Sequence, residues 1–363
     1  MWAYWLLFLV PAGIAFSPIR FDKNVNYMLW AMVGLLGTLL IGLRYKVGGD
    51  WDSYLVYFAL AQTGDLSRIL LVGNGNASGY MFLNWVMVQL GLGIYAVNLV
   101  CGAIVMVGLV KFCQKQPMPW IALAVAMPYL VCCVAMGYTR QAAALGFLLW
   151  GLSILRKGNE HKFFGLILIG SLLHLSLLVT LPLMVLTRDK ILWRYYLLSG
   201  PLVAGLYYLF STIDVLQYYA LIYEYTMTRE SAGGAIRAYM NLLPVIVSFF
   251  FWDRIKRISP DFKIIKWMGI IAILAIPLLS FSTTMVDRFS LYLMPLQIAL
   301  WPRLIAIQRT KLSRSVWASI ITVYYGLILF VWFNFAVTRD EWVPYRMWPF
   351  TSEPIYPALL PMF

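Results

Sequence analysis

The stretch YMLWAMVGLLGTLLIGLRYKVGGDWDSY, residues 27–54, indicates both the fold class and the place of the candidate site. Its first part, Tyr27 to Leu43, is an apolar run long enough to cross most of a bilayer as a helix. Its second part, Arg44 to Tyr54, places two cations, two carboxylates, a glycine pair and aromatic rings at the water boundary. The stretch therefore predicts a membrane helix followed by a loop with functional side chains.

This loop has two interpretations. Arg44 and Lys46 could hold an anion, and Asp50 could accept a proton or fix a sugar hydroxyl. Gly48 and Gly49 can take backbone angles closed to other residues, so they can turn the chain sharply and bring its amides near a ligand. The alternative is a polar cap that ends the helix, because Arg, Lys and Trp are common anchors at the membrane interface.

The composition is that of a membrane protein. Hydrophobic residues make up 62% of the 363 residues, charged residues 12%, and the mean hydropathy is +0.78, whereas a soluble domain carries about 25% charged residues. We expect one all-α polytopic domain over residues 1–363 with about 10–12 membrane helices, at about 20 residues per span. The net charge of +13 indicates topology rather than nucleic-acid binding. The four cysteines form no C-x-x-C pair, so we predict no metal site and no disulfide framework.

Apolar segments alternate with polar connections along the chain. The segments are 1–16, 27–43, 94–112, 119–136, 138–155, 163–187, 195–211, 237–252, 264–282, 288–304 and 315–337. Three polar regions are expected outside the membrane. They are 44–93 with an amphipathic or re-entrant helix from Tyr80 to Gln89, 211–236 as a candidate lid, and the tail 338–363.

Positive charges give the orientation of these segments, because Lys and Arg gather on the cytoplasmic side. Six clusters hold 19 of the 28 basic residues: Arg20/Lys23, Lys111/Lys115, Arg156/Lys157/Lys162, Arg188/Lys190/Arg194, Arg254/Lys256/Arg257/Lys263/Lys266 and Arg303/Arg309/Lys311/Arg314. If every segment crossed the membrane once, the clusters would alternate correctly until segment 163–187, which has a cluster at each end. A single crossing there would place the later clusters outside. If the segment is broken and turns back, both of its ends stay on the cytoplasmic side.

The break is expected at His174, in the sequence Ser171-Leu172-Leu173-His174-Leu175-Ser176. We predict two half-helices that meet near His174, and both of their outer ends face the cytoplasm. Broken backbone at this depth is tolerated only where protein or water covers it. His174 then faces a wet cavity open to the outside, either as a general base or as a hydrogen-bonded contact between helices.

The remaining basic residues are mostly arginines, which bind phosphate oxygens through a planar fork. Arg140, in Gly137-Tyr138-Thr139-Arg140-Gln141, lies close to lipid, where a charge is costly and indicates function, although snorkelling to the headgroups would also explain it. Arg288 opens another span, with Asp287 as a local ion-pair partner and Tyr292 one turn away on the same face. We expect these arginines and Arg44 to converge on one external cavity.

As an ordered set, these pieces resemble the Wzy-type polysaccharide polymerases, in particular the EpsG-like branch. The matching pieces are Leu43 to Tyr54, Gly79-Tyr80 to Asn84, Tyr138 to Gln141, His174 to Ser176, Asp287-Arg288 with Tyr292, and Pro344-Tyr345-Arg346. They occur in the family's order and cover nearly the whole chain.

The resemblance implies a GT-C-like glycosyltransferase in the bacterial inner membrane, with its site facing the periplasm. The donor would be a growing glycan on undecaprenyl diphosphate, the acceptor a single repeat on the same lipid, and a flippase and a chain-length regulator are candidate partners. The implied roles are diphosphate binding by Arg140, Arg288 and Arg44, and proton removal by His174 or Asp50, without a metal or cofactor. Substrate binding falls to Lys46, Gly48, Gly49, Tyr54, Tyr138, Gln141, Tyr292, Tyr345 and Arg346.

Three alternatives remain open. An O-antigen ligase-like enzyme would use the same donor with a different acceptor, and the sequence separates the two poorly. A transporter or flippase for a lipid-linked oligosaccharide predicts charges through the membrane depth and pseudo-symmetric halves, and no internal repeat is visible. A membrane-bound acyltransferase would place its histidine near the cytoplasmic side, which the charge pattern disfavours.

Overall fold

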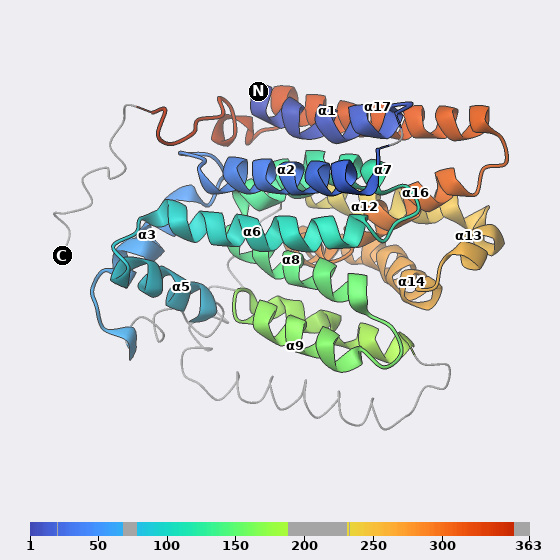
Figure 1. Ribbon diagram of the computed structural model, residues 1–363. Helices are drawn as coiled ribbons and strands as arrows, with labels where there is room; N and C mark the ends of the chain where they lie inside the picture. Colours follow the sequence, from blue (N-terminus) through green and yellow to red (C-terminus); the bar gives the residue numbers. More distant parts are fainter. Residues whose placement is uncertain (20, 68–77, 188–230, 232, 352–363) are drawn as a thin grey trace.

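The computed structural model describes residues 1–19, 21–67, 78–187, 231 and 233–351. Within these ranges every regular element is a helix (Figure 1), and the backbone pairing of Arg44 with Met347 is an isolated bridge. The first half contains α1(Trp2–Phe16), α2(Lys23–Gly42), α3(Trp51–Ala61), α5(Ser78–Gln89), α6(Ile94–Cys113), α7(Pro119–Ala126), η1(Met127–Ala135) and α8(Thr139–Ile154). The second contains α9(Glu160–Ser171), η2(Leu175–Thr187), α12(Gly234–Phe249), α13(Trp252–Ile258), α14(Phe262–Leu278), α15(Thr283–Leu291), α16(Pro295–Ala306), α17(Lys311–Phe335) and η3(Arg339–Glu341).

The helices are those of a polytopic membrane protein, which confirms the predicted fold class. Among the described residues, α2, α6 and α17 are each long and apolar enough to span a bilayer. The bent pairs α12–α13 and α15–α16 raise this number to five if each pair is one span. Helix α5, Ser78–Gln89, includes the amphipathic piece expected from Tyr80 to Gln89. The candidate lid at 211–236 lies outside the described residues except for 231 and 233–236, as does the cluster at Arg188, Lys190 and Arg194.

The connections between helices lie at one or the other of the two ends of the bundle. The links α1–α2, α6–α7, α8–α9 and α16–α17, which carry basic clusters, lie at the right end in Figure 1. The link from α2 to α3, the start of α8 and the chain after α17 lie at the left end. This separation agrees with the charge-based topology for the described connections.

The chain reverses at His174. Helix α9 ends at Ser171, and the amide of His174 donates to the carbonyl of Gly170 within a tight turn. The 3-10 helix η2 then begins at Leu175 and packs back against α9, with Leu177 beside Gly170 (Figure 1). The predicted pair of half-helices is therefore confirmed.

Close glycine contacts fix the position of α8. A Cβ on Gly146 would lie 2.7 Å from the carbonyl oxygen of Ile104, and Gly108 of α6 directly faces Gly146. Small residues allow the backbones of membrane helices to approach in this way, which increases their van der Waals contact. Helix α8 is thus held rigidly along α6, and its first turn projects into the left end of the bundle.

A buried polar chain holds α15 in place. The amide nitrogen of Asn241 donates to the carbonyl of Ser290, and Gln297 donates to the side-chain oxygen of Asn241, at 2.7 and 2.6 Å. Tyr325 of α17 donates to Gln297 and accepts from the indole nitrogen of Trp301. In an apolar interior such satisfied groups specify one arrangement of helices.

The segment 339–350, which we name the C-terminal clasp, folds back onto the loop after α2. The amides of Tyr45 and Trp348 donate to the carbonyls of Arg346 and Leu43, at 3.0 and 2.8 Å. The indole of Trp342 donates to the carbonyl of Cys132 in η1, while its own carbonyl accepts from the Tyr4 hydroxyl at 2.6 Å. The described part of the expected external tail is therefore an integral part of the bundle.

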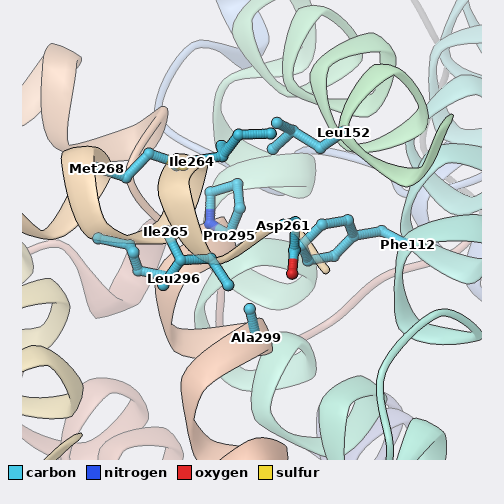
Figure 2. A pocket seen from close by; sticks show the side chains of 9 residues that line it. All are labelled: Phe112, Leu152, Asp261, Ile264, Ile265, Met268, Pro295, Leu296 and Ala299. Carbon is cyan, nitrogen blue, oxygen red and sulfur yellow. The ribbon is translucent and has the colours of Figure 1, made fainter. Parts of the chain in front are cut away.

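Figure 2 shows a small cavity that does not belong to the candidate site. It is lined by Phe112, Leu152, Asp261, Ile264, Ile265, Met268, Pro295, Leu296 and Ala299. Phe112 and Leu152 come from the last turns of α6 and α8, away from the candidate site, and the other lining residues come from the first half of α14 with its N-cap and from α16. The carboxylate of Asp261 accepts two hydrogen bonds from Arg303, both 2.9 Å. The cavity is therefore a packing feature beside a structural ion pair.

Candidate functional site

The loop after α2 is built around Arg44, whose side chain is fully buried. Its guanidinium donates to the carbonyls of Ile41 and Val47 and to the hydroxyl of Thr139, at 2.6, 3.2 and 2.6 Å. It thereby caps the carbonyl of Ile41 in the last turn of α2, closes the loop at Val47 and ties the loop to the first residue of α8. All of its donor groups face the protein, so the geometry argues against the predicted diphosphate contact and for a structural role.

The two glycines of the loop serve different purposes. Gly48 is buried with φ +99°, a conformation that L side chains rarely adopt. A Cβ there would lie 2.8 Å from the Cα of Gly137 and closer still to the carbonyl oxygen of Met136. Gly49 is exposed, and a Cβ there would meet only the carboxylate of Glu341, 2.5 Å from Oε2. Gly48 thus allows close backbone packing, whereas Gly49 leaves space for one side chain.

Arg140 enters the site from the first turn of α8. The nine residues Met127–Ala135, which end two positions before Gly137, form a π-helix, η1, an irregular element often found at functional sites. The guanidinium of Arg140 lies 4.8 Å from the ring centre of Tyr57 in α3, and its amide contacts the Tyr54 hydroxyl at 3.5 Å. The ring of Tyr57 in α3 therefore holds the guanidinium of Arg140, which is only partly buried, through a cation–π contact.

Asp50 is the N-cap residue of α3. Burial raises the pKa of its carboxyl group, because loss of water disfavours the charged form. The guanidinium groups of Arg140 and Arg288 and the hydroxyl of Tyr54 act in the opposite direction and favour the carboxylate. These interactions show that Asp50 and the two arginines occupy one electrostatic environment.

His174 lies at the turn between α9 and η2 and within electrostatic range of the same two arginines. Its Nδ1 atom lies 2.7 Å from the hydroxyl of Ser176, which in turn lies 2.7 Å from the Tyr292 hydroxyl. The Tyr292 hydroxyl also interacts with the Gln141 side chain. Ser176 can accept a hydrogen bond from Nδ1 and donate to Tyr292, which leaves Nε2 of His174 as a base.

Arg288 is exposed on α15, and it does not form the predicted local pair with Asp287. Asp287 instead pairs with Arg237 at the start of α12 and accepts a hydrogen bond from Ser231 at 2.8 Å. Gln141 donates to the carbonyl of Arg288 at 3.0 Å, so α8 fixes the backbone on which this arginine stands. The ion-pair hypothesis is therefore wrong, and the charge of Arg288 acts on Asp50 and His174.

The structure thus brings together Asp50, Tyr54, Arg140, Gln141, His174, Arg288 and Tyr292. Among the other residues predicted to bind substrate, Tyr345 is buried and donates to the carbonyl of Leu40 at 2.7 Å, which gives it a structural role. Arg346 and Lys46 are exposed, and the ammonium of Lys46 lies 5.4 Å from the ring centre of Tyr45. Tyr138 is partly buried just before α8.

The described residues contain no group of three or more His, Cys, Asp or Glu side chains placed to hold a metal ion. The described cysteines Cys101, Cys113, Cys132 and Cys133 are all free and buried. The site is therefore described by its cations, its carboxylate, its histidine and the hydroxyl groups around them.

The comparison with protein families gives a match over most of the chain. The model of the EpsG family matches residues 27–347, from the first turns of α2 to the C-terminal clasp. The chain belongs to the EpsG family. EpsG membership associates it with polysaccharide biosynthesis at a bacterial membrane. No match was found among curated proteins or among solved structures.

Sequence reasoning did not select several residues of this EpsG protein's site. Ser176 stood in a quoted motif, but its contact with Tyr292 joins elements 116 residues apart. Tyr57 follows Tyr54 by three residues, a spacing that places both on one face of α3, and this signal could have indicated it. Nothing in the local sequence indicates that Glu341 lies beside Gly49.

Proposed function

We propose that this protein is a polysaccharide polymerase. It transfers a growing glycan from undecaprenyl diphosphate to the non-reducing end of a repeat unit carried on a second undecaprenyl diphosphate. The observation that carries the proposal is the convergence of Arg140, Arg288, Asp50 and His174 at the end of the bundle opposite the described basic clusters. Family membership supports the link to exopolysaccharide.

In this mechanism the two arginines hold the leaving group. The acceptor hydroxyl oxygen attacks the anomeric carbon of the donor, and the bond from that carbon to the diphosphate breaks with its electron pair. Arg140 and Arg288 stabilise the negative charge that develops on the diphosphate, because fixed cations in a partly dry site need no rearrangement during the reaction. The aromatic contact of Arg140 with Tyr57 preserves this position. Arg44 does not contact the diphosphate in this mechanism, and its role is to hold the loop after α2 in place.

His174 takes the proton of the attacking hydroxyl on Nε2. This role requires Nδ1 to carry a proton and donate it to Ser176, which then donates to Tyr292. Asp50 accepts hydrogen bonds from sugar hydroxyls on the same side. With a base in place, a single displacement that inverts the anomeric centre is the simplest route.

The lipid tails are proposed to reach the site from the side of the bundle. An apolar groove of about 360 Å³ runs between α12 and α17, and Ile236, Tyr239, Leu243 and Tyr324 line it. Its lining residue Ile236 is followed in α12 by Arg237, whose partner Asp287 precedes Arg288 in the chain. A polyprenyl chain in this groove would therefore place its diphosphate beside the arginines.

We further propose a GT-C-like arrangement in the bacterial inner membrane, with the site at the periplasmic face. The described basic clusters support this orientation, because Lys and Arg gather in the cytoplasm. A flippase would supply the lipid-linked repeat on that face, and a chain-length regulator would act on the product. The proposal includes no nucleic-acid partner.

A complementation experiment tests the proposed function. Cells that lack the gene are given the wild-type protein or one of Arg140→Ala, Arg288→Ala and His174→Ala, and the length of the surface glycan is measured on a gel. Polymerase loss leaves single-repeat products, whereas loss of a ligase would leave long lipid-linked chains unattached. Arg339→Ala is the matched control, because this arginine is half-exposed and pairs with Asp340. Long polymer in all three site variants would refute the assignment.

A further inference from the structure

Glu341, in the C-terminal clasp, lies directly beside the glycine loop. The carbonyl of Glu341 accepts a hydrogen bond of 2.7 Å from the amide of Gly48, so its backbone is fixed against the loop. Its carboxylate occupies the space over Gly49, where a Cβ would come within 2.5 Å of Oε2 and 3.7 Å of Oε1. The absence of a side chain at residue 49 is what permits this position.

Asp50 follows this glycine in the chain, and its charge acts on the carboxylate of Glu341. Partial burial raises the pKa of the Glu341 carboxyl group, and the charge of Asp50 raises it further. Within the described ranges, ion pairs link Arg237 with Asp287, Arg303 with Asp261, and Arg339 with Asp340, and none involves Glu341. An exposed carboxylate held beside another carboxylate, without a cation among the described residues, has acceptor capacity to spare.

The charges of the site come from different elements. Arg140 and Arg288 supply cations from α8 and α15, and Asp50 and Glu341 supply carboxylates from the loop and the clasp. A diphosphate is attracted to the cations and repelled by the carboxylates. Neutral sugar hydroxyls are good donors to carboxylates, and these charge-assisted hydrogen bonds are stronger than neutral ones.

We infer that Glu341 binds hydroxyl groups of the acceptor sugar, and that Asp50, Gly49 and Glu341 together form the acceptor subsite. This inference rests on the proposed function and adds to it the C-terminal clasp as part of the substrate site. Gly49 contributes the space that Glu341 occupies. The subsite accepts a neutral, hydroxyl-rich saccharide.

The test uses the purified full-length protein in liposomes and the lipid-linked single repeat extracted from cells that lack this gene. Polymerisation rates are measured in two series. In the first, the concentration of the single repeat, the acceptor, is varied at a fixed concentration of a preformed longer donor. In the second, the concentration of the donor is varied at a fixed concentration of the acceptor. Glu341→Gln removes the charge and keeps the shape of the side chain. Gly49→Ala keeps the charge and displaces the carboxylate. Asp340→Asn is the control, because this neighbouring carboxylate is exposed and pairs with Arg339.

Glu341→Gln and Gly49→Ala are expected to raise the KM for the acceptor about tenfold, as for the loss of one charge-assisted hydrogen bond, with the KM for the donor unchanged. Glu341→Asp should recover part of the loss, and Asp340→Asn should match the wild type. Equal changes in both KM values, or none, would overturn the inference while leaving the polymerase intact. A loss of wild-type activity on addition of EDTA would assign the carboxylates to a divalent cation instead. Absence of polymer with the wild-type protein would overturn the proposed function together with the inference.

Discussion

Three glycine-to-alanine variants, at Gly48 and Gly49 in the loop after α2 and at Gly64 after α3, separate the contributions of backbone conformation, backbone packing and side-chain position. Gly64 has φ +89° and nothing within 4 Å of the position where a Cβ would stand. Alanine there meets only the conformational penalty of positive φ, about 1–2 kcal/mol, partly offset by a less flexible unfolded chain. Gly64→Ala is therefore the reference for the other two variants.

Gly48→Ala carries the same conformational penalty and adds a collision with backbone atoms of Met136 and Gly137. The loop must move away, which breaks the hydrogen bond from Gly48 to Glu341 and strains the contacts of Arg44 with Val47. With the positive-φ penalty and about 1 kcal/mol for each of these two hydrogen bonds, the total loss of stability is about 3–4 kcal/mol. Gly49→Ala displaces only the end of the flexible Glu341 side chain, so the protein should keep wild-type stability.

The assay measures the fraction of detergent-purified protein that remains monodisperse in gel filtration after heating, because membrane proteins commonly unfold irreversibly. The expected order of resistance is wild type equal to Gly49→Ala, then Gly64→Ala, then Gly48→Ala well below. If Gly48→Ala survived heating as well as Gly64→Ala, the packing of the loop against the turn before α8 would be refuted.

Further predictions concern the buried arginine, the histidine and the carboxylate. Arg44→Gln should lower stability by about 3–5 kcal/mol, because three buried partners lose a charged donor. Gel filtration after heating measures this loss of stability directly, whereas a shorter polymer would not distinguish it from a loss of substrate binding. Ser176→Ala should lower kcat at least tenfold with little change in KM, because the His174 ring loses the group that orients Nδ1; an unchanged kcat would contradict the orienting role. The pKa of Asp50 is raised, so activity that needs its carboxylate is lost as the pH falls through a value above 3.8. Arg288→Ala removes a cation that favours the carboxylate, so the residual activity should show this acid limb at a still higher pH, and a shift to lower pH would contradict the assignment.

Much of the fold follows from local patterns in the sequence. The apolar runs predict α2, α6 and α17 because a bilayer requires a minimum length of apolar chain. The break at His174 follows from the positive charges on both sides of one segment, since a single crossing would place later clusters outside. The convergence of Arg140 and Arg288 could be expected because the charge pattern places both near helix ends on the same side of the membrane. Arg140 lies in the first turn of α8 as expected, whereas Arg288 lies in the last turn of α15 and does not open a span.

The remaining features depend on contacts between distant parts of the chain. Arg44 has the same sequence signals as Arg140, and only the partners supplied by Ile41 and Thr139 distinguish a structural arginine from an exposed one. Asp287 pairs with Arg237 and not with its sequence neighbour Arg288, because α12 brings the Arg237 guanidinium to the buried side of α15. The C-terminal clasp could not be predicted, since its hydrogen bonds join residues about 300 positions apart.

The most direct measurement follows the length of the glycan made by the purified protein alone. Liposomes that contain the protein are incubated with the lipid-linked single repeat, and the products are separated by size while released undecaprenyl diphosphate is quantified. The account predicts a ladder of lipid-linked products and one undecaprenyl diphosphate for each linkage formed, with both signals lost in Arg140→Ala. A repeat that stays single with the wild-type protein, or a ladder that persists in Arg140→Ala, would contradict it.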